Sequence, residues 1–153
     1  MSNYTIISEN DFQKAREAIK SARKSGKEII FASNDDELNR KILEREKIDI
    51  LLIKLEGRKD KLKQRNSGFN QVMAKLALKN SVAIATDICE IENAGSKIEK
   101  AKIIARLRQN VELCKKNKLK MVFIRNNSAS SGNRSLKALG LVLGMPTWMT
   151  KEL

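Results

Sequence analysis

Short apolar segments alternate along the chain with longer stretches in which apolar residues recur at every third or fourth position. The short segments are rich in β-branched residues and predict strands at 4–7, 29–32, 48–53, 82–86 and 121–124. The longer stretches predict helices at 11–25, 35–43, 72–76, 97–117 and 136–143. Strands that alternate with helices indicate βαβ units, so we expect an α/β fold with a parallel sheet. A sixth strand at Trp148 stays open as an alternative.

Polar residues just before two of the predicted helices have the spacing of a capping box. Asn10 is followed three positions later by Gln13, and Asn34 is followed in the same way by Glu37. We therefore expect Asn10 and Asn34 to be the N-caps of the first two helices. The strand at 48–53 is almost continuously apolar, which favours burial on both of its faces, as in a parallel sheet.

The composition predicts a single globular domain over residues 1–153. Hydrophobic residues make up 41% of the chain and charged residues 32%, which is typical of a folded chain rather than a disordered one. No apolar run reaches the roughly 18 residues that a membrane span needs, and the first residues lack the pattern of a signal peptide. We expect a cytoplasmic protein that has no membrane partner.

The chain contains no histidine, and this restricts its chemistry sharply. Catalytic triads and dyads that use histidine are excluded, as are metal sites built on histidine ligands. No glycine-rich phosphate loop is present, and a carboxylate-only Mg²⁺ site through Asp60, Asp87 and Glu90 is a minor alternative. We expect no catalytic residue, no metal and no cofactor bound by the protein, so the chain is not an enzyme on its own. Cys114 lies on an apolar helical stripe and is expected to be a buried structural thiol.

Positive charge is the most informative bulk property. Lys and Arg total 31 against 18 Asp and Glu, which gives a net charge of +13. An excess of this size favours a polyanionic partner, with nucleic acid ahead of a membrane surface. Aromatic residues are scarce at 4%, so contact through phosphates and RNA shape is favoured over stacking platforms. Tyr4, Phe69 and Trp148 remain the candidates for stacking.

The basic residues concentrate in a few places. Five cations fall in one predicted loop after a strand: Arg58, Lys59, Lys61, Lys63 and Arg65. Such a loop opens at the carboxyl edge of a parallel sheet, where ligands usually bind, and a phosphate backbone would relieve the repulsion among the cations. A loop that is merely solvated is the alternative.

Two further groups of basic residues are candidates for RNA contact. In the helix predicted at 97–117, a spacing of 100° per residue directs Lys102, Arg106, Arg108 and Lys116 away from the apolar face. Any surface helix directs charges outward, so this observation is less specific. Arg125 and Arg134 bracket a polar loop at 126–133, whose small side chains can donate to phosphate or sugar oxygens.

Several motifs occur in an order that is more specific than any one of them. They are Leu38-Asn39-Arg40-Lys41, Ile48-Asp49-Ile50-Leu51, Gly57-Arg58-Lys59-Asp60, the run 66–77 (NSGFNQVMAKLA), Val82-Ala83-Ile84 and the run 105–116 (ARLRQNVELCKK). This series resembles archaeal ribonuclease P protein component 3. The match is dense from about residue 39 to residue 127 and continues more weakly to residue 144.

The resemblance implies a fold and a function. The fold is a shortened TIM-like (β/α) barrel of parallel strands, like that of the PHP superfamily but without its catalytic metal site. The function is that of a non-catalytic protein subunit of ribonuclease P, which binds and supports the catalytic RNA in removing the 5′ leader of precursor tRNA. The implied partners are ribonuclease P RNA, protein component 2 and, indirectly, precursor tRNA; Mg²⁺ is needed by the RNA. Positions that match the family's basic motif residues, and so imply RNA contact, are Arg58, Lys59, Lys75, Arg106 and Arg108.

The sequence departs from the family pattern in three respects. Gln71 stands where the family usually has histidine, and residues 61–65 form an insertion that adds positive charge. The family's first strands and its C-terminal helices have no counterpart, so we expect an open edge that a partner or a second copy would cover. Two other functions remain in competition: a general RNA- or ribosome-binding protein of the same fold, and a PHP-like phosphoesterase that works alone.

Overall fold

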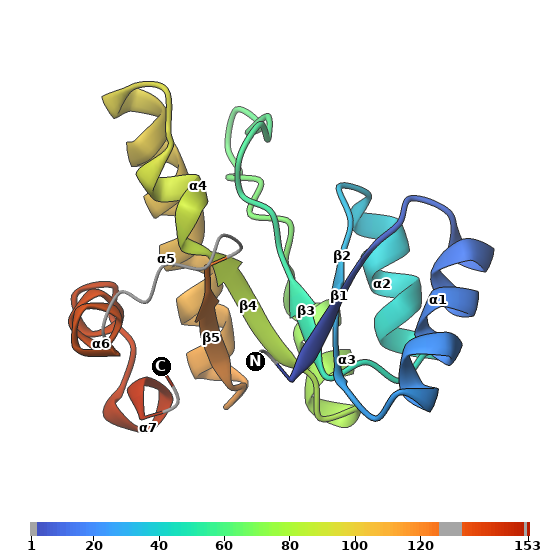
Figure 1. Ribbon diagram of the computed structural model, residues 1–153. Helices are drawn as coiled ribbons and strands as arrows, with labels where there is room; N and C mark the ends of the chain where they lie inside the picture. Colours follow the sequence, from blue (N-terminus) through green and yellow to red (C-terminus); the bar gives the residue numbers. More distant parts are fainter. Residues whose placement is uncertain (1–2, 126–132, 152) are drawn as a thin grey trace.

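A five-stranded parallel sheet forms the centre of the computed structural model, which describes residues 3–125, 133–151 and 153 (Figure 1). The strands are β1 (Tyr4–Ser8), β2 (Glu28–Ala32), β3 (Ile50–Leu52), β4 (Ala83–Asp87) and β5 (Met121–Ile124). They lie in the sheet in the same order as in the chain, and all neighbouring strands are parallel. The predicted α/β fold with a parallel sheet is therefore confirmed, and β3 is shorter than its apolar run suggested.

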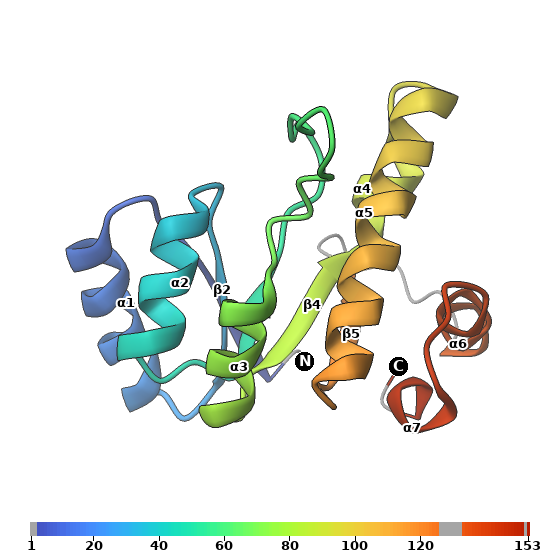
Figure 2. The same ribbon diagram turned by 180° about the vertical axis from the view of Figure 1, so that it is seen from behind.

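The helices lie mainly on one face of this sheet. They are α1 (Phe12–Lys24), α2 (Asp36–Arg45), α3 (Gln71–Lys79), α4 (Ile88–Glu92), α5 (Lys97–Lys116), α6 (Asn133–Val142) and α7 (Thr147–Thr150). In Figure 2, α1, α2, α3 and α5 stand in front of the strands, whereas Figure 1 shows the opposite face of the sheet. Helices α6 and α7 lie beyond β5 in both views. No described helix combines the length and the apolar character that a membrane span requires.

Both faces of the sheet are apolar. The helix-covered face holds the main core, in which Leu51 of β3 and Leu107 of α5 are fully buried. The opposite face carries a smaller cluster made by alternate residues of the same strands: Ile30, Ala32, Leu52, Ala85 and Ile124, with Tyr4, Ile6, Ile50 and Val122 partly buried beside them. This pattern explains the continuous apolar run of β3. Cys114 is buried in the main core, as expected, and burial raises the pKa of its thiol to about 12.

The sheet is open in the part of the chain that the structure describes. There β1 pairs with β2 alone and β5 pairs with β4 alone. The consecutive strand order is the one found in (β/α) barrels. An open edge, as expected from the departures from the family pattern, is therefore present, and closure of a barrel is not seen among these residues.

The starts of the first two helices differ from the prediction by one residue. The N-cap of α1 is Asp11, whose side chain accepts the N–H of Lys14 at 3.0 Å, and the N-cap of α2 is Asp35. The predicted caps Asn10 and Asn34 were therefore wrong. In each case the chain uses the next residue, and its carboxylate interacts more favourably than an amide with the positive end of the helix dipole.

Two short helices were not predicted. Helix α4 follows β4 without a loop, with Asp87 as its N-cap, and α7 begins after Pro146. Trp148 lies in α7, so the alternative of a sixth strand at this position was wrong.

Candidate nucleic-acid interface

The basic loop predicted from the sequence connects β3 to α3 and covers residues 53–70, which we call the β3–α3 loop. It rises beyond the carboxyl ends of the strands, between α2 on one side and α4 and α5 on the other (Figures 1 and 2). Loops longer than about 12–15 residues without strands or helices of their own are usually functional or disordered. The side-chain contacts described next give this one a defined conformation.

Arg106 of α5 is the main anchor of the β3–α3 loop. Its side chain is 2% exposed, and its Nη1 and Nη2 atoms donate to the carbonyl oxygens of Leu55 at 2.9 Å and of Arg58 at 2.7 Å. Its Nε atom donates to Asp60 Oδ1 at 3.3 Å. One guanidinium thus satisfies two backbone carbonyls and pairs with one carboxylate, which offsets much of the cost of burying its charge.

Other side chains of α5 and α4 hold the remainder of the loop. Asn110 Nδ2 donates to the carbonyl oxygen of Ser67 at 3.1 Å, and Gln109 Nε2 donates to the hydroxyl of Ser67 at 3.2 Å. Near the start of the loop, the N–H of Leu55 donates to Glu90 Oε2 at 2.8 Å. These side chains supply partners to loop groups that a helix or strand would otherwise pair through its backbone.

A second ion pair ties the loop to α2. Arg58 donates through Nη1 and Nη2 to the two carboxylate oxygens of Asp36, at 2.8 and 2.9 Å, and its side chain is 9% exposed. Its Nε atom donates to the carbonyl oxygen of Lys54. Gly68 lies against the same guanidinium: a Cβ there would overlap Arg58, and its φ of +72° also favours glycine.

Asp60 closes the base of the loop tip. Its Oδ1 atom accepts the N–H of Asn66 at 2.7 Å in addition to Arg106 Nε. The Asn66 hydrogen bond, followed by the hydrogen bond and positive charge of Arg106, lowers the pKa of this carboxyl. We call residues 60–66 the tip hairpin, because Lys61 and Gln64 form an antiparallel bridge inside it.

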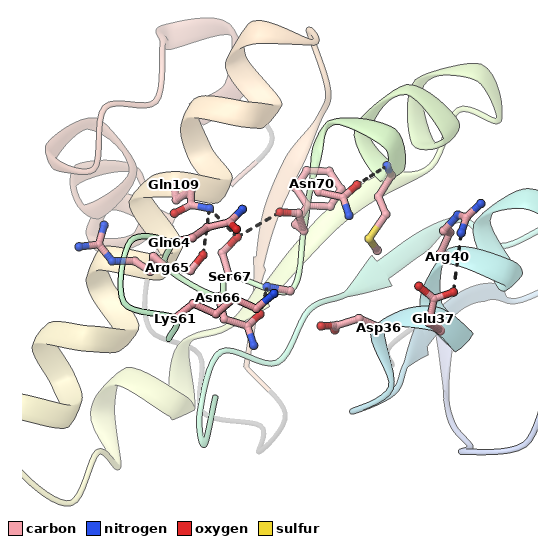
Figure 3. Close-up of a pocket in the computed structure, with 13 residues that line it drawn as sticks. Asp36, Glu37, Arg40, Lys61, Gln64, Arg65, Asn66, Ser67, Asn70 and Gln109 are labelled. Carbon is pink, nitrogen blue, oxygen red and sulfur yellow. Dashed lines mark hydrogen bonds and ion pairs between the residues drawn. The ribbon is translucent and has the colours of Figure 1, made fainter. Parts of the chain in front are cut away.

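A cavity of about 310 Å³ lies between the tip hairpin, α2, α3 and α5 (Figure 3). Lys61, Arg65 and Asn66 border it on the loop side, and Glu37 and Arg40 border it on the side of α2. Its walls therefore offer both donors and acceptors. Donors and acceptors of this kind can form hydrogen bonds with phosphate and ribose groups.

The structure separates the predicted RNA-contact residues of the loop and α5 into two groups. Arg106 is buried and the side chain of Arg58 is 9% exposed, both in the ion pairs described above, so the expectation that Arg106 projects away from the apolar face was wrong. The exposed cations are Lys59, Lys61, Lys63 and Arg65 of the loop and Lys102, Arg108 and Lys116 of α5. Arg65 and Arg108 border the same shallow groove between the loop and α5, so the fold brings these two predicted residues together.

The other three predicted residues lie elsewhere. Lys75 is exposed on α3, which packs against the helical face of the sheet, whereas the tip hairpin rises beyond it (Figure 2). Arg125 follows β5, and its Nη2 atom donates to Glu92 Oε1 at 2.5 Å. Arg134 is exposed on α6. The polar loop between Arg125 and Arg134 was a candidate too, and residues 126–132 lie outside the described part of the chain.

The carboxylates considered for Mg²⁺ have other partners. Asp60 pairs with Arg106, Asp87 caps α4, and Glu90 accepts the N–H of Leu55. Burial raises the pKa of Glu90, and the Leu55 hydrogen bond partly opposes this effect. Over residues 3–125 and 133–151, no group of three or more acidic or cysteine side chains is placed to hold a metal ion.

Of the three aromatic candidates for stacking, Trp148 alone is exposed in the structure. Phe69 is buried in the main core, and Tyr4 is partly buried on the face of the sheet opposite the helices. Trp148 remains 44% exposed on α7, beyond β5. The basic loop therefore presents cations without an exposed aromatic ring among its described residues, which agrees with contact through phosphates.

No protein-family model and no curated protein matches the chain. Among solved structures, a chain in the cryo-EM structure of archaeal ribonuclease P with mature tRNA matches 97% of this chain, with a TM-score of 0.79 and 23% identity. A crystal structure of an uncharacterized protein matches 80% of this chain and 34% of its own, with a TM-score of 0.56 and 10% identity. This chain spans 62% of the length of the matching ribonuclease P chain. At these identities the similarity establishes a shared fold.

The anchoring role of Arg106 can be tested against Arg108, which lies on the same helix and is exposed. Arg106→Met leaves two loop carbonyls and Asp60 without their donor, so we expect the free energy of unfolding to fall by about 3–5 kcal/mol. Arg108→Met should change it by less than about 0.5 kcal/mol. Urea unfolding of the two variants measures the difference. Equal losses in both variants would contradict the assignment.

The lowered pKa of Asp60 predicts a pH-dependent contribution to stability. Because the pKa is lower in the folded state than in the unfolded state, the contribution is complete above the unfolded value and disappears as pH falls through the folded value. At neutral pH, Asp60→Asn should therefore be less stable than the wild type by about 1 kcal/mol. This difference should shrink as pH falls below the unfolded value of about 4 and through the lower folded value. A difference that stays constant down to acid pH would show that the Asp60 charge does not contribute.

Proposed function

We propose that this chain is a non-catalytic protein subunit of ribonuclease P that binds and supports the catalytic RNA. The observation that carries the proposal is the fold likeness over 97% of the chain to a protein chain of archaeal ribonuclease P with mature tRNA. The ordered motifs at 57–60, 66–77 and 105–116 support the same family from the sequence. The reaction served is removal of the 5′ leader of precursor tRNA, and the subunit acts as component 3 of the archaeal particle.

The arrangement of charge supports an RNA partner. The net charge is +13, and exposed cations gather on the β3–α3 loop and the adjacent part of α5. Lys and Arg side chains that meet phosphates release counterions, and this release drives RNA binding without any aromatic platform. Arg58 and Arg106 serve this surface indirectly, by holding the loop that presents the exposed cations.

The proposed assembly has further members. Component 2 is the proposed protein partner, precursor tRNA is bound indirectly through the particle, and Mg²⁺ is required by the RNA rather than by this chain. Residues 1–153 act as one domain whose sheet belongs to a shortened (β/α) barrel of the PHP type, in a cytoplasmic particle. The consecutive order of the five parallel strands supports this barrel relationship.

A general RNA- or ribosome-binding role is the second candidate, because cations that contact phosphates do not read sequence. Recovery of RNA with the tagged protein separates the two. The proposal expects ribonuclease P RNA to be enriched over ribosomal RNA, whereas enrichment of ribosomal RNA alone favours the second candidate.

Reconstituted cleavage of precursor tRNA tests the proposed function. With the cognate ribonuclease P RNA and component 2 at moderate Mg²⁺, adding this protein should increase the rate of cleavage. The double variant Lys63→Glu, Arg65→Glu should lose much of the increase, because it reverses two exposed loop charges. Lys20→Glu, an exposed position on α1, should keep it. If omitting the protein leaves cleavage unchanged, the proposed function is wrong.

A further inference from the structure

The end of the tip hairpin presents an apolar side chain to solvent. The N–H of Lys61 donates to the carbonyl oxygen of Gln64 at 2.9 Å, and the N–H of Gln64 donates back to Lys61 at 3.2 Å. This pair of hydrogen bonds places Leu62 and Lys63 in the turn between them. Leu62 is fully exposed, at 106%, and among the large apolar side chains described it is the most exposed.

A single exposed leucine is common on protein surfaces, but the setting of Leu62 is unusual. It lies in the turn of the hairpin at the end of a projecting loop, with Lys61 and Lys63 as its neighbours in the chain and Arg65 two positions after Lys63. Three side chains of the same charge around an apolar tip would repel one another in isolation. Phosphate groups on either side of the leucine would relieve this repulsion.

The hairpin is also held in place before any partner arrives. The N–H of Asn66 and the Nε atom of Arg106 both donate to Asp60 at its base, and Gln109 Nε2 reaches the carbonyl oxygen of Arg65 at 3.5 Å. A segment that is ordered in advance loses little conformational freedom on binding. The tip is thus built to present Leu62 rather than to fold around a partner.

We propose that Leu62 packs against the face of an unpaired or helix-terminal nucleobase, while Lys61, Lys63 and Arg65 hold the phosphates beside it. Apolar side chains, including leucine, are used in this way as wedges against base steps, and unpaired RNA bases are open to such contact. The inference rests on the proposed RNA-binding function and adds a base contact to it. A protein surface is the competing occupant, and the flanking cations make RNA the better fit.

Binding measurements with three point variants test the role of the leucine. The probes are the cognate ribonuclease P RNA and an unrelated structured RNA of equal length, each titrated at several KCl concentrations. Leu62→Ser should weaken binding by about tenfold or more, because the apolar contact is lost, and should leave the salt dependence unchanged. Leu62→Met keeps an apolar side chain and should bind like the wild type. Lys63→Gln should instead reduce the slope of log K against log salt by about 0.7–0.9, the value of one phosphate contact.

A fluorescence measurement reports on the contact directly. The chain has one tryptophan, so Trp148→Phe combined with Leu62→Trp places the sole indole at the hairpin tip. Its emission should be quenched when RNA is added, because the indole stacks on a base. Trp148→Phe combined with Lys20→Trp is the matched control on exposed α1, and its emission should stay unchanged. Thermal unfolding checks that each variant folds, which is expected because Leu62 makes no core contact.

The possible outcomes distinguish the inference from the proposed function. If the wild type prefers ribonuclease P RNA but Leu62→Ser binds equally well and the tip indole is not quenched, the inference is overturned and the proposed function stands. If the wild type binds both RNAs equally, the proposed function fails, and the effect of Leu62→Ser on either RNA still decides the inference. Binding to neither RNA overturns both. If Leu62→Ser keeps its RNA affinity but no longer assembles with component 2, the tip contacts protein and the inference is overturned.

Discussion

The buried guanidinium of Arg106 is the interaction on which the proposed binding surface depends. It connects α5 to the carbonyl oxygens of Leu55 and Arg58 and to the carboxylate of Asp60. Burying an arginine is costly unless every donor finds a partner, and here the partners are groups that a loop cannot satisfy by itself. The same contacts therefore stabilise the charge and give the loop its shape. On the other side of the loop, Asp36 of α2 forms an ion pair with Arg58 and so fixes the loop to that helix.

This arrangement divides the basic residues into two roles. The buried Arg106 and the partly buried Arg58 hold the backbone of the β3–α3 loop, and the exposed Lys59, Lys61, Lys63 and Arg65 carry the charge that a polyanion would meet. The parallel sheet places the loop beyond its carboxyl edge, and the contacts of Arg58 and Arg106 hold the loop that carries the cations. A fixed array of this kind binds phosphates at a lower entropic cost than a mobile tail of the same charge.

The sequence predicted the five strands and the parallel sheet, because their apolar periods reflect burial directly. Arg106 was predicted to lie outside because it directly precedes Leu107 and so lies about 100° from it around the helix, away from the centre of the apolar stripe. The spacing along the helix was the better indication of burial. Arg106 lies three positions after Ile103 and four before Asn110, so all three share the buried face with Leu107. The order of the tip hairpin could not be predicted locally, since Arg106 and Asp60 lie 46 positions apart. The RNA contacts themselves and the protein partner remain predictions.

Lysine footprinting of the protein, free and bound to the cognate ribonuclease P RNA, shows whether the β3–α3 loop meets the RNA. Acetylation followed by mass spectrometry reports the accessibility of each lysine. We expect RNA to protect Lys59, Lys61 and Lys63 on the β3–α3 loop, while Lys14 and Lys20 on α1 stay reactive. Protection confined to α1, with the loop lysines as reactive as in the free protein, would contradict this expectation.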